Sequence, residues 1–186
     1  MKLDTATLTG TAILAALVVV FDYTLKYSNL KIPFPPAPFL RFDLTGIPIV
    51  LSLLLYGFVP GIFTSAIASI AILARSADAL GSSMKGLAEF STILGMFLAF
   101  KLFNKMRIVG AFALGITMRV LIMTFANLLV IYVGLMAIPA SYVNIPLLYF
   151  SLLGAFNAAQ GTISVAGGLL IYEAVKKRIS TKINKT

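Results

Sequence analysis

The sequence predicts an all-α protein: an integral membrane bundle of six transmembrane helices with a proline-rich loop between the first and the second. Of its 186 residues, 60% are hydrophobic and 11% are charged, whereas soluble domains carry roughly 25% charged residues. A membrane span needs about 20 apolar residues, so this length allows about six spans joined by short loops. No room remains for a separate aqueous domain, and residues 1–186 are expected to form one transmembrane domain.

The composition also excludes several classes of function. Histidine and cysteine are both absent, which removes imidazole bases, thiolate nucleophiles, disulfides and the usual zinc or haem ligands. We therefore expect no enzyme, no catalytic or metal site and no cofactor. The net charge of +9 is attributed to basic residues where helices leave the bilayer. No nucleic-acid partner is expected, because no basic stretch outside the apolar segments is interleaved with aromatic residues.

The first span is expected at about Leu8–Tyr27 and is interpreted as retained rather than as a cleaved signal, because no small-residue cleavage site follows its apolar run. The loop Ser28–Arg41 comes next and holds four prolines. Proline does not fit a helix interior, so this loop is predicted to be extended. It is unusually apolar for a solvent loop, which favours a place at the membrane interface or a lid over the bundle.

The remaining spans are divided by glycine, proline and polar breaks. Leu44–Leu73 is apolar but contains Gly57-Phe-Val-Pro-Gly61, which indicates either one kinked helix or two short helices with a turn, the turn being favoured. After a polar stretch at Arg75–Lys85, three further spans are predicted, and a basic tail follows them. Their approximate bounds are Gly86–Phe103, Val109–Leu135 and Leu147–Val175, with the tail at Lys176–Thr186.

The distribution of lysine and arginine does not decide between five and six spans. With six spans and a cytoplasmic N-terminus, the inside holds nine basic residues, including Lys2, and the outside holds five. With five spans the bias toward the cytoplasm is sharper, because the group from Lys26 to Arg41 moves inside. The turn at Gly57–Gly61 favours six.

Charged residues inside spans mark candidate sites, because their insertion costs roughly 2.5–3.5 kcal/mol each. Asp22 and Lys26 are one helical turn apart and are expected to pair. Lys85 and Glu89 are likewise one helical turn apart and are also expected to pair. Arg119 has no partner in its own segment, so it faces the bundle interior or a ligand pocket, or it extends to the membrane surface.

Neutral polar residues form a second set of candidates. Asn127 falls in one predicted span, and Asn157 and Gln160 share a face of the last one. These amides either pair between helices or bind a planar heterocyclic ligand, because each amide offers both a donor and an acceptor. Ala12 and Ala16 place small residues four apart on the first span, a spacing that allows another helix to approach closely.

One stretch of the chain resembles a known family. It reads Pro35-Pro-Ala-Pro-Phe-Leu-Arg-Phe-Asp-Leu-Thr-Gly-Ile-Pro48 and is followed by Gly57-Phe-Val-Pro-Gly61. This stretch is similar to the first loop and second helix of the substrate-binding S components of energy-coupling factor (ECF) vitamin transporters, and most similar to their riboflavin-specific branch. Asn157 matches a ligand-contacting Asn of that branch. Gln160 stands where a Lys is typical, and Arg75-Ser76 replaces a Lys-Asn pair.

The resemblance implies a plasma-membrane protein with both termini in the cytoplasm that binds a vitamin, riboflavin first, from outside. Its partners would be a transmembrane coupling protein, docked through Ala12 and Ala16, and two ABC-type ATPases. The substrate-binding residues it implies are Phe39, Leu40, Asp43, Lys85, Glu89, Asn127, Asn157 and Gln160.

Three alternatives remain open. The first is an S component for pantothenate, pyridoxine or another vitamin. The second is a self-sufficient secondary transporter, for which Glu89 is the nearest candidate for an ion-coupling carboxylate. The third is a structural membrane protein.

Overall fold

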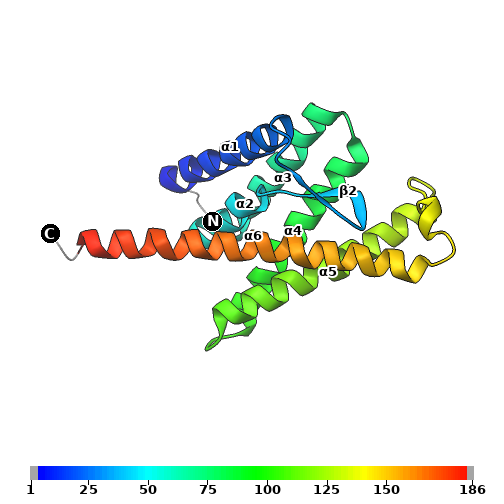
Figure 1. Ribbon diagram of the computed structural model, residues 1–186. Helices are drawn as coiled ribbons and strands as arrows, with labels where there is room; N and C mark the ends of the chain where they lie inside the picture. Colours follow the sequence, from blue (N-terminus) through cyan, green and yellow to red (C-terminus); the bar gives the residue numbers. More distant parts are fainter. Residues whose placement is uncertain (1–3, 184–186) are drawn as a thin grey trace.

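The computed structural model describes the backbone of residues 4–183 and the side-chain surroundings of residues 4–178. Lys2 and residues 184–186 of the predicted basic tail lie outside this part. Within it the chain forms six α-helices, a two-stranded hairpin and one turn of 3-10 helix (Figure 1). These elements are α1 (Thr5–Tyr27), β1 (Ile32–Phe34), β2 (Ala37–Phe42), α2 (Gly46–Tyr56), α3 (Phe58–Ser76), α4 (Ala79–Leu102), α5 (Arg107–Tyr132), η1 (Ala140–Tyr142) and α6 (Pro146–Ile183).

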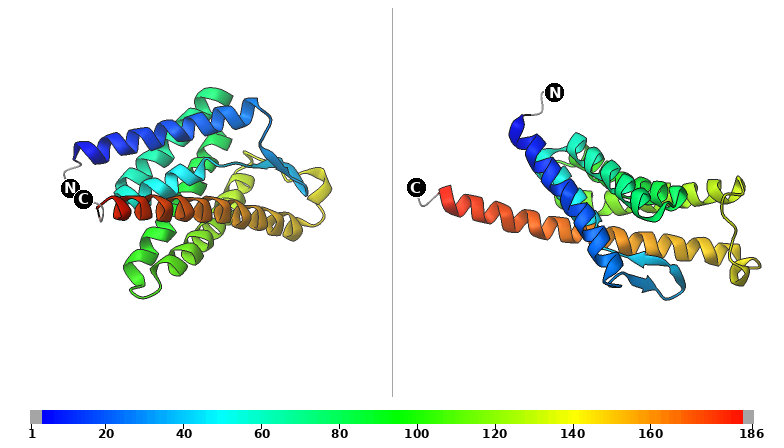
Figure 2. Two further views of the ribbon diagram at one scale, coloured as in Figure 1. Left: turned by 60° about the vertical axis from the view of Figure 1, so that its left-hand side comes forward. Right: turned by 90° about the horizontal axis from the view of Figure 1, so that it is seen from above.

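The helices run back and forth between two ends of a bundle. The beginning of α1, the end of α6 and the α4–α5 connection lie at one end (Figures 1 and 2). The hairpin and η1 lie at the other, which we call the hairpin end. In the described part, α1, α3 and α5 are long and apolar enough to cross a membrane, whereas α2 is apolar but has only 11 residues. The number of membrane crossings therefore stays a prediction.

A single glycine separates α2 from α3. Gly57 has φ +100°, a left-handed conformation that glycine adopts at little cost, and a Cβ added there would meet nothing within 4 Å. Of the two expected arrangements, the structure has two helices. Pro60 falls in the first turn of α3, where the missing N–H would have no helical partner. The break is thus confined to one residue and does not extend to Gly61.

Two predicted boundaries were wrong. The polar stretch from Arg75 to Lys85, predicted to separate two spans, is mostly helical, because α4 begins at Ala79. The Asp78 side chain caps this helix by accepting a hydrogen bond from the Gly81 N–H at 2.8 Å. Lys85 therefore lies inside α4. The last helix also continues beyond its predicted end at Val175, through the basic residues to Ile183.

The proline-rich segment is extended, as expected, but it forms an antiparallel β-hairpin instead of an irregular loop. Ile32 pairs with Phe42 and Pro33 with Arg41, with an irregularity before Phe34. Both strands are edges of a two-stranded sheet, a position in which proline is tolerated. Phe42 packs against Phe156 of α6 with ring centroids 5.0 Å apart. The hairpin is therefore held on the bundle.

The core lies where α2, α4 and α6 meet. Ile49, Val50, Ile93, Met96 and Val165 are fully buried there in one apolar cluster. This cluster fixes the position of α2, whose start follows directly on the hairpin. The core therefore orients the residues between β2 and α2 toward α4 and α6.

Candidate ligand-binding site

A cavity of about 610 Å³ opens at the hairpin end of the bundle. Ligand sites in proteins usually measure about 300–1,000 Å³. Residues from α1, the hairpin, α3, α4, α5 and α6, and from the loops beside them, line it. Seven of the eight sequence-predicted binding residues are among them: Phe39, Leu40, Asp43, Lys85, Asn127, Asn157 and Gln160. The eighth, Glu89, is not among the lining residues but contacts two of them, Lys85 and Arg119.

Asp22 of α1 is fully buried and contacts two cations. Lys31, just before β1, approaches its Oδ1 at 2.5 Å, and Arg75, near the end of α3, donates from Nε to Oδ2 at 2.6 Å. The expected pair between Asp22 and Lys26 was wrong. Asp22 faces the bundle, where α3 and the hairpin supply cations, whereas the Lys26 side chain stays exposed and has no ion pair in the described part of the chain.

Asp43, between β2 and α2, is the next carboxylate. Its Oδ1 lies 2.9 Å from the Lys85 Nζ and accepts hydrogen bonds from the Thr45 hydroxyl at 2.7 Å and the Thr45 N–H at 3.1 Å. Its Oδ2 lies 3.7 Å from the Lys31 Nζ. Burial raises the pKa of the Asp43 carboxyl, but the charges of Lys85 and Lys31 and the Thr45 hydrogen bonds outweigh burial and bring that pKa to about 2. Asp43 is therefore ionised at neutral pH.

Glu89 is the third carboxylate and is fully buried. Its Oε1 lies 2.8 Å from the Lys85 Nζ, the pair expected from the sequence, and 3.1 Å from the Arg119 Nη1. Arg119 is also buried and donates to the Thr92 hydroxyl at 3.1 Å. The Arg119 side chain therefore lies inside the bundle, at the wall of the cavity, and does not extend to the membrane surface.

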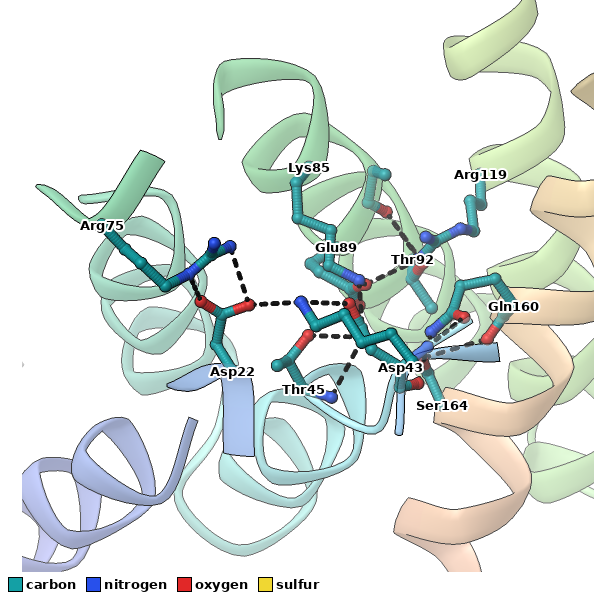
Figure 3. Close-up of polar contacts among 12 residues, drawn as sticks. Asp22, Asp43, Thr45, Arg75, Lys85, Glu89, Thr92, Arg119, Gln160 and Ser164 are labelled. Atoms are coloured by element: carbon teal, nitrogen blue, oxygen red, sulfur yellow. Dashed lines mark hydrogen bonds and ion pairs between the residues drawn. The ribbon is translucent and has the colours of Figure 1, made fainter. Parts of the chain in front are cut away.

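Together these residues form an alternating chain of charges across five parts of the fold (Figure 3). Each carboxylate contacts two cations, and four cations share three carboxylates. Breaking a buried ion pair by removing one partner costs about 3–5 kcal/mol, so this chain fixes the hairpin relative to the helices. In order, its members are Arg75, Asp22, Lys31, Asp43, Lys85, Glu89 and Arg119.

The three amides do not pair with one another between helices. Asn127 and Asn157 each donate to a carbonyl of their own helix, at 2.6 and 2.9 Å. This donation fixes the amide orientation and leaves both Oδ1 atoms without a hydrogen bond in the described residues. Gln160 differs, because its amide makes two hydrogen bonds with the Asp43 backbone. It therefore positions the residue that follows the hairpin.

Sequence reasoning missed several cavity residues. Lys31 and Arg75 were not proposed as site residues, because both contact Asp22, which is distant from them in the sequence and close only in the folded protein. Tyr149 and Phe156 of α6 also line the cavity, and Tyr149 is 1% exposed. Tyr149 and Phe156 are seven residues apart, which places them two turns apart on one face of a helix. This spacing was the signal in the sequence that could have identified them as a pair facing the cavity.

The predicted docking residues lie elsewhere. Ala12 and Ala16 are exposed on α1 and do not line the cavity. The buried face of the same helix carries Leu14, Ala15 and Val18. The structure thus leaves a small-residue face of α1 uncovered by this chain.

Comparisons with known proteins agree with this architecture. No family model matches the chain, and no curated protein sequence matches it either. Among solved structures, the S component of a bacterial ECF transporter is similar, with a TM-score of 0.72 and 18% sequence identity. The match covers 94% of this chain and 97% of the other. At this identity the likeness shows that the two proteins share a fold.

Proposed function

We propose that this chain, as a single transmembrane domain in the plasma membrane, is the binding subunit of a vitamin uptake system. It takes its ligand into the cavity at the hairpin end and relies on a separate ATP-driven coupling module for transport. The observation that carries this proposal is a cavity of ligand size, bordered by a hairpin that the charge chain anchors, in a fold shared with an S component.

Riboflavin is the first ligand to consider. Its flavin ring is planar and largely apolar, with an imide N–H at one edge and a hydroxylated side chain. The rings of Tyr149 and Phe156 offer apolar surface for such a ring system. The Oδ1 atoms of Asn127 and Asn157 are available as hydrogen-bond acceptors, which suits a ligand rich in N–H and O–H donors. Pantothenate and pyridoxine are the alternatives within the same class of protein.

A titration of riboflavin fluorescence against the purified protein tests the ligand. We expect quenching, and a visible flavin absorption band if ligand is retained through purification. Asn157→Leu should weaken binding at least about tenfold, because it removes from the cavity wall a buried hydrogen-bond acceptor that the ligand would use. Asn104→Leu, the same change at an exposed site in the α4–α5 connection, is the matched control. A colourless protein that leaves riboflavin fluorescence unchanged would rule out riboflavin.

The orientation follows from the same proposal. Both termini are placed in the cytoplasm and the hairpin end outside, so that the cavity meets the vitamin. The exposed face at Ala12 and Ala16 is then the surface that docks on a transmembrane coupling protein driven by two ABC-type ATPases. Exposed small residues in a lipid-facing helix suit close helix approach.

A self-sufficient secondary transporter is the second candidate, with Glu89 as its ion-coupling carboxylate. Two cations contact this carboxylate at 2.8 and 3.1 Å, so an incoming ion would have to compete with both. Liposomes containing only this chain distinguish the candidates. Ligand accumulation driven by an ion gradient supports the transporter, and binding without accumulation supports the S component.

A further inference from the structure

Two cations at the edge of the cavity have no ionic partner in the described residues. Lys26, near the end of α1, and Arg41, in β2, both line the cavity, and both side chains are exposed. We call these two residues the cationic rim. By contrast, Lys31, Arg75, Lys85 and Arg119, which also line it, all contact carboxylates of the charge chain.

The charge balance around the cavity is therefore positive. Six cations line it, whereas the carboxylates that line it or contact those cations number four: Asp22, Asp43, Asp78 and Glu89. Two positive charges remain in excess within the described residues. A pocket lined mainly by one sign of charge raises the local concentration of ligands of opposite sign.

The usual cause of clustered basic residues at a membrane does not explain the rim. Lysine and arginine accumulate on the cytoplasmic side, and the proposed function places the hairpin end outside. Both rim residues belong to the group from Lys26 to Arg41 that makes the cytoplasmic charge bias sharper with five spans. Lys26 and Arg41 thus occur where topology disfavours them, which indicates a role in the cavity.

We propose that the ligand of this cavity is an organic anion, whose carboxylate or phosphate group binds at Lys26 and Arg41. The uncharged part of the ligand lies deeper, against Tyr149 and Phe156. An arginine side chain suits this role because its planar guanidinium donates two parallel hydrogen bonds to a carboxylate or phosphate. The inference rests on the proposed binding function and narrows its ligand class to anions such as pantothenate or riboflavin 5′-phosphate, so that neutral riboflavin becomes the weaker ligand.

Two pairs of compounds that differ in charge test the inference. The first is riboflavin and its 5′-phosphate, and the second is pantothenol and pantothenate. Binding is measured by calorimetry with the full chain in a neutral detergent at low salt. We expect the anionic member of at least one pair to bind about tenfold more tightly than its neutral partner, and high salt to reduce the difference.

The double variant Lys26→Gln/Arg41→Gln should abolish the preference for the anion. The double variant Lys105→Gln/Arg107→Gln makes the same change in charge at two exposed positions, one in the α4–α5 connection and one at the first residue of α5. These lie at the other end of the bundle, and the variant should retain the preference. Circular dichroism verifies that both variants are folded.

The outcomes separate this inference from the proposed function. If compounds of these pairs bind but neither pair shows a preference for its anionic member, the anion inference is wrong and the binding function stands. If no member of either pair binds the folded protein, the anion inference is wrong, and if pyridoxine does not bind it either, the binding function is wrong as well. The same titration with the protein in lipid nanodiscs tests whether the anion that binds at the rim is the headgroup of a membrane lipid. If phosphatidylglycerol, but not phosphatidylcholine, removes the preference, the rim binds lipid headgroups and the inference is overturned.

Discussion

Gln160 of α6 holds the main chain of Asp43 by two hydrogen bonds: the Asp43 N–H donates to the Gln160 Oε1 at 3.1 Å, and the Gln160 Nε2 donates to the Asp43 carbonyl at 2.9 Å. The two residues are 117 positions apart in the sequence. This contact fixes the point where the hairpin joins α2. The carboxylate of Asp43 is thereby held between the two lysines of the charge chain.

Replacing Gln160 should release the hairpin without unfolding the bundle. Gln160→Leu leaves a buried N–H and a buried carbonyl of Asp43 unpaired, at a cost of about 1–3 kcal/mol each. We expect faster amide hydrogen exchange in the hairpin, measured by mass spectrometry, with little change in α4. Asn157→Leu, one turn away on the same helix, is the control. Unchanged exchange in Gln160→Leu would show that the contact does not hold the hairpin.

The pairing of Asp22 with Arg75 allows a double-mutant cycle. Asp22→Asn should lower stability by about 3–5 kcal/mol, because it leaves Lys31 and Arg75 without their shared carboxylate. Adding Arg75→Gln removes one of these cations, so the double variant should be more stable than the sum of the single changes predicts. The chain contains no tryptophan or cysteine, so thermal unfolding is followed by circular dichroism. Additive losses would contradict the pairing.

Asp43 gives a prediction on pH. Its pKa in the folded protein is about 2, below the ordinary 3.8, so its stabilising contribution is complete above about pH 4. As the pH falls toward 2 the contribution disappears, a change of roughly 2 kcal/mol. The melting temperature of Asp43→Asn should therefore fall less over this range than that of the wild type. Asp78→Asn, at an exposed helix cap, should retain the wild-type profile. If the melting temperatures of the wild type and of Asp43→Asn fall in parallel with pH, ionised Asp43 does not contribute the predicted stability.

The predicted docking face is tested by added bulk. Ala12→Trp/Ala16→Trp should abolish vitamin uptake in cells that express the coupling module, because large side chains prevent close helix approach. Vitamin binding by the purified variant should be unchanged, since neither residue lines the cavity. Leu121→Trp/Phe125→Trp on the exposed face of α5 adds bulk away from α1 and should support uptake. If uptake survives in the α1 variant, docking does not use this face.

How far the sequence predicts this molecule depends on the range of each interaction. Local signals predicted the helices, the break near Gly57 and the i, i+4 pair of Lys85 and Glu89. The start of α4 was placed too late, at about Gly86, because Asp78 was assigned to the polar stretch before the span and not recognised as a helix cap. The pairing of Asp22 with Arg75 spans 53 positions, and no local periodicity encodes such a contact.

The hairpin tip carries the last prediction. The Tyr142 hydroxyl, in η1, donates a hydrogen bond of 2.6 Å to the Pro36 carbonyl. This bond joins the tip of the hairpin to the α5–α6 connection, and each of these two segments contributes lining residues to the proposed binding cavity, Phe39 and Met136 among them. Such a bond contributes about 1 kcal/mol, so Tyr142→Phe should raise the rate of ligand release about fivefold and leave melting nearly unchanged. Stopped-flow fluorescence with bound flavin, or displacement of a labelled ligand, measures the release rate.

Tyr132→Phe is the matched control for this change, because Tyr132 is 92% exposed at the end of α5 and has no hydrogen bond in the described residues. It removes the same hydroxyl without touching the hairpin, so its release rate should equal that of the wild type. If Tyr142→Phe releases ligand at the wild-type rate as well, opening at the hairpin tip does not limit release.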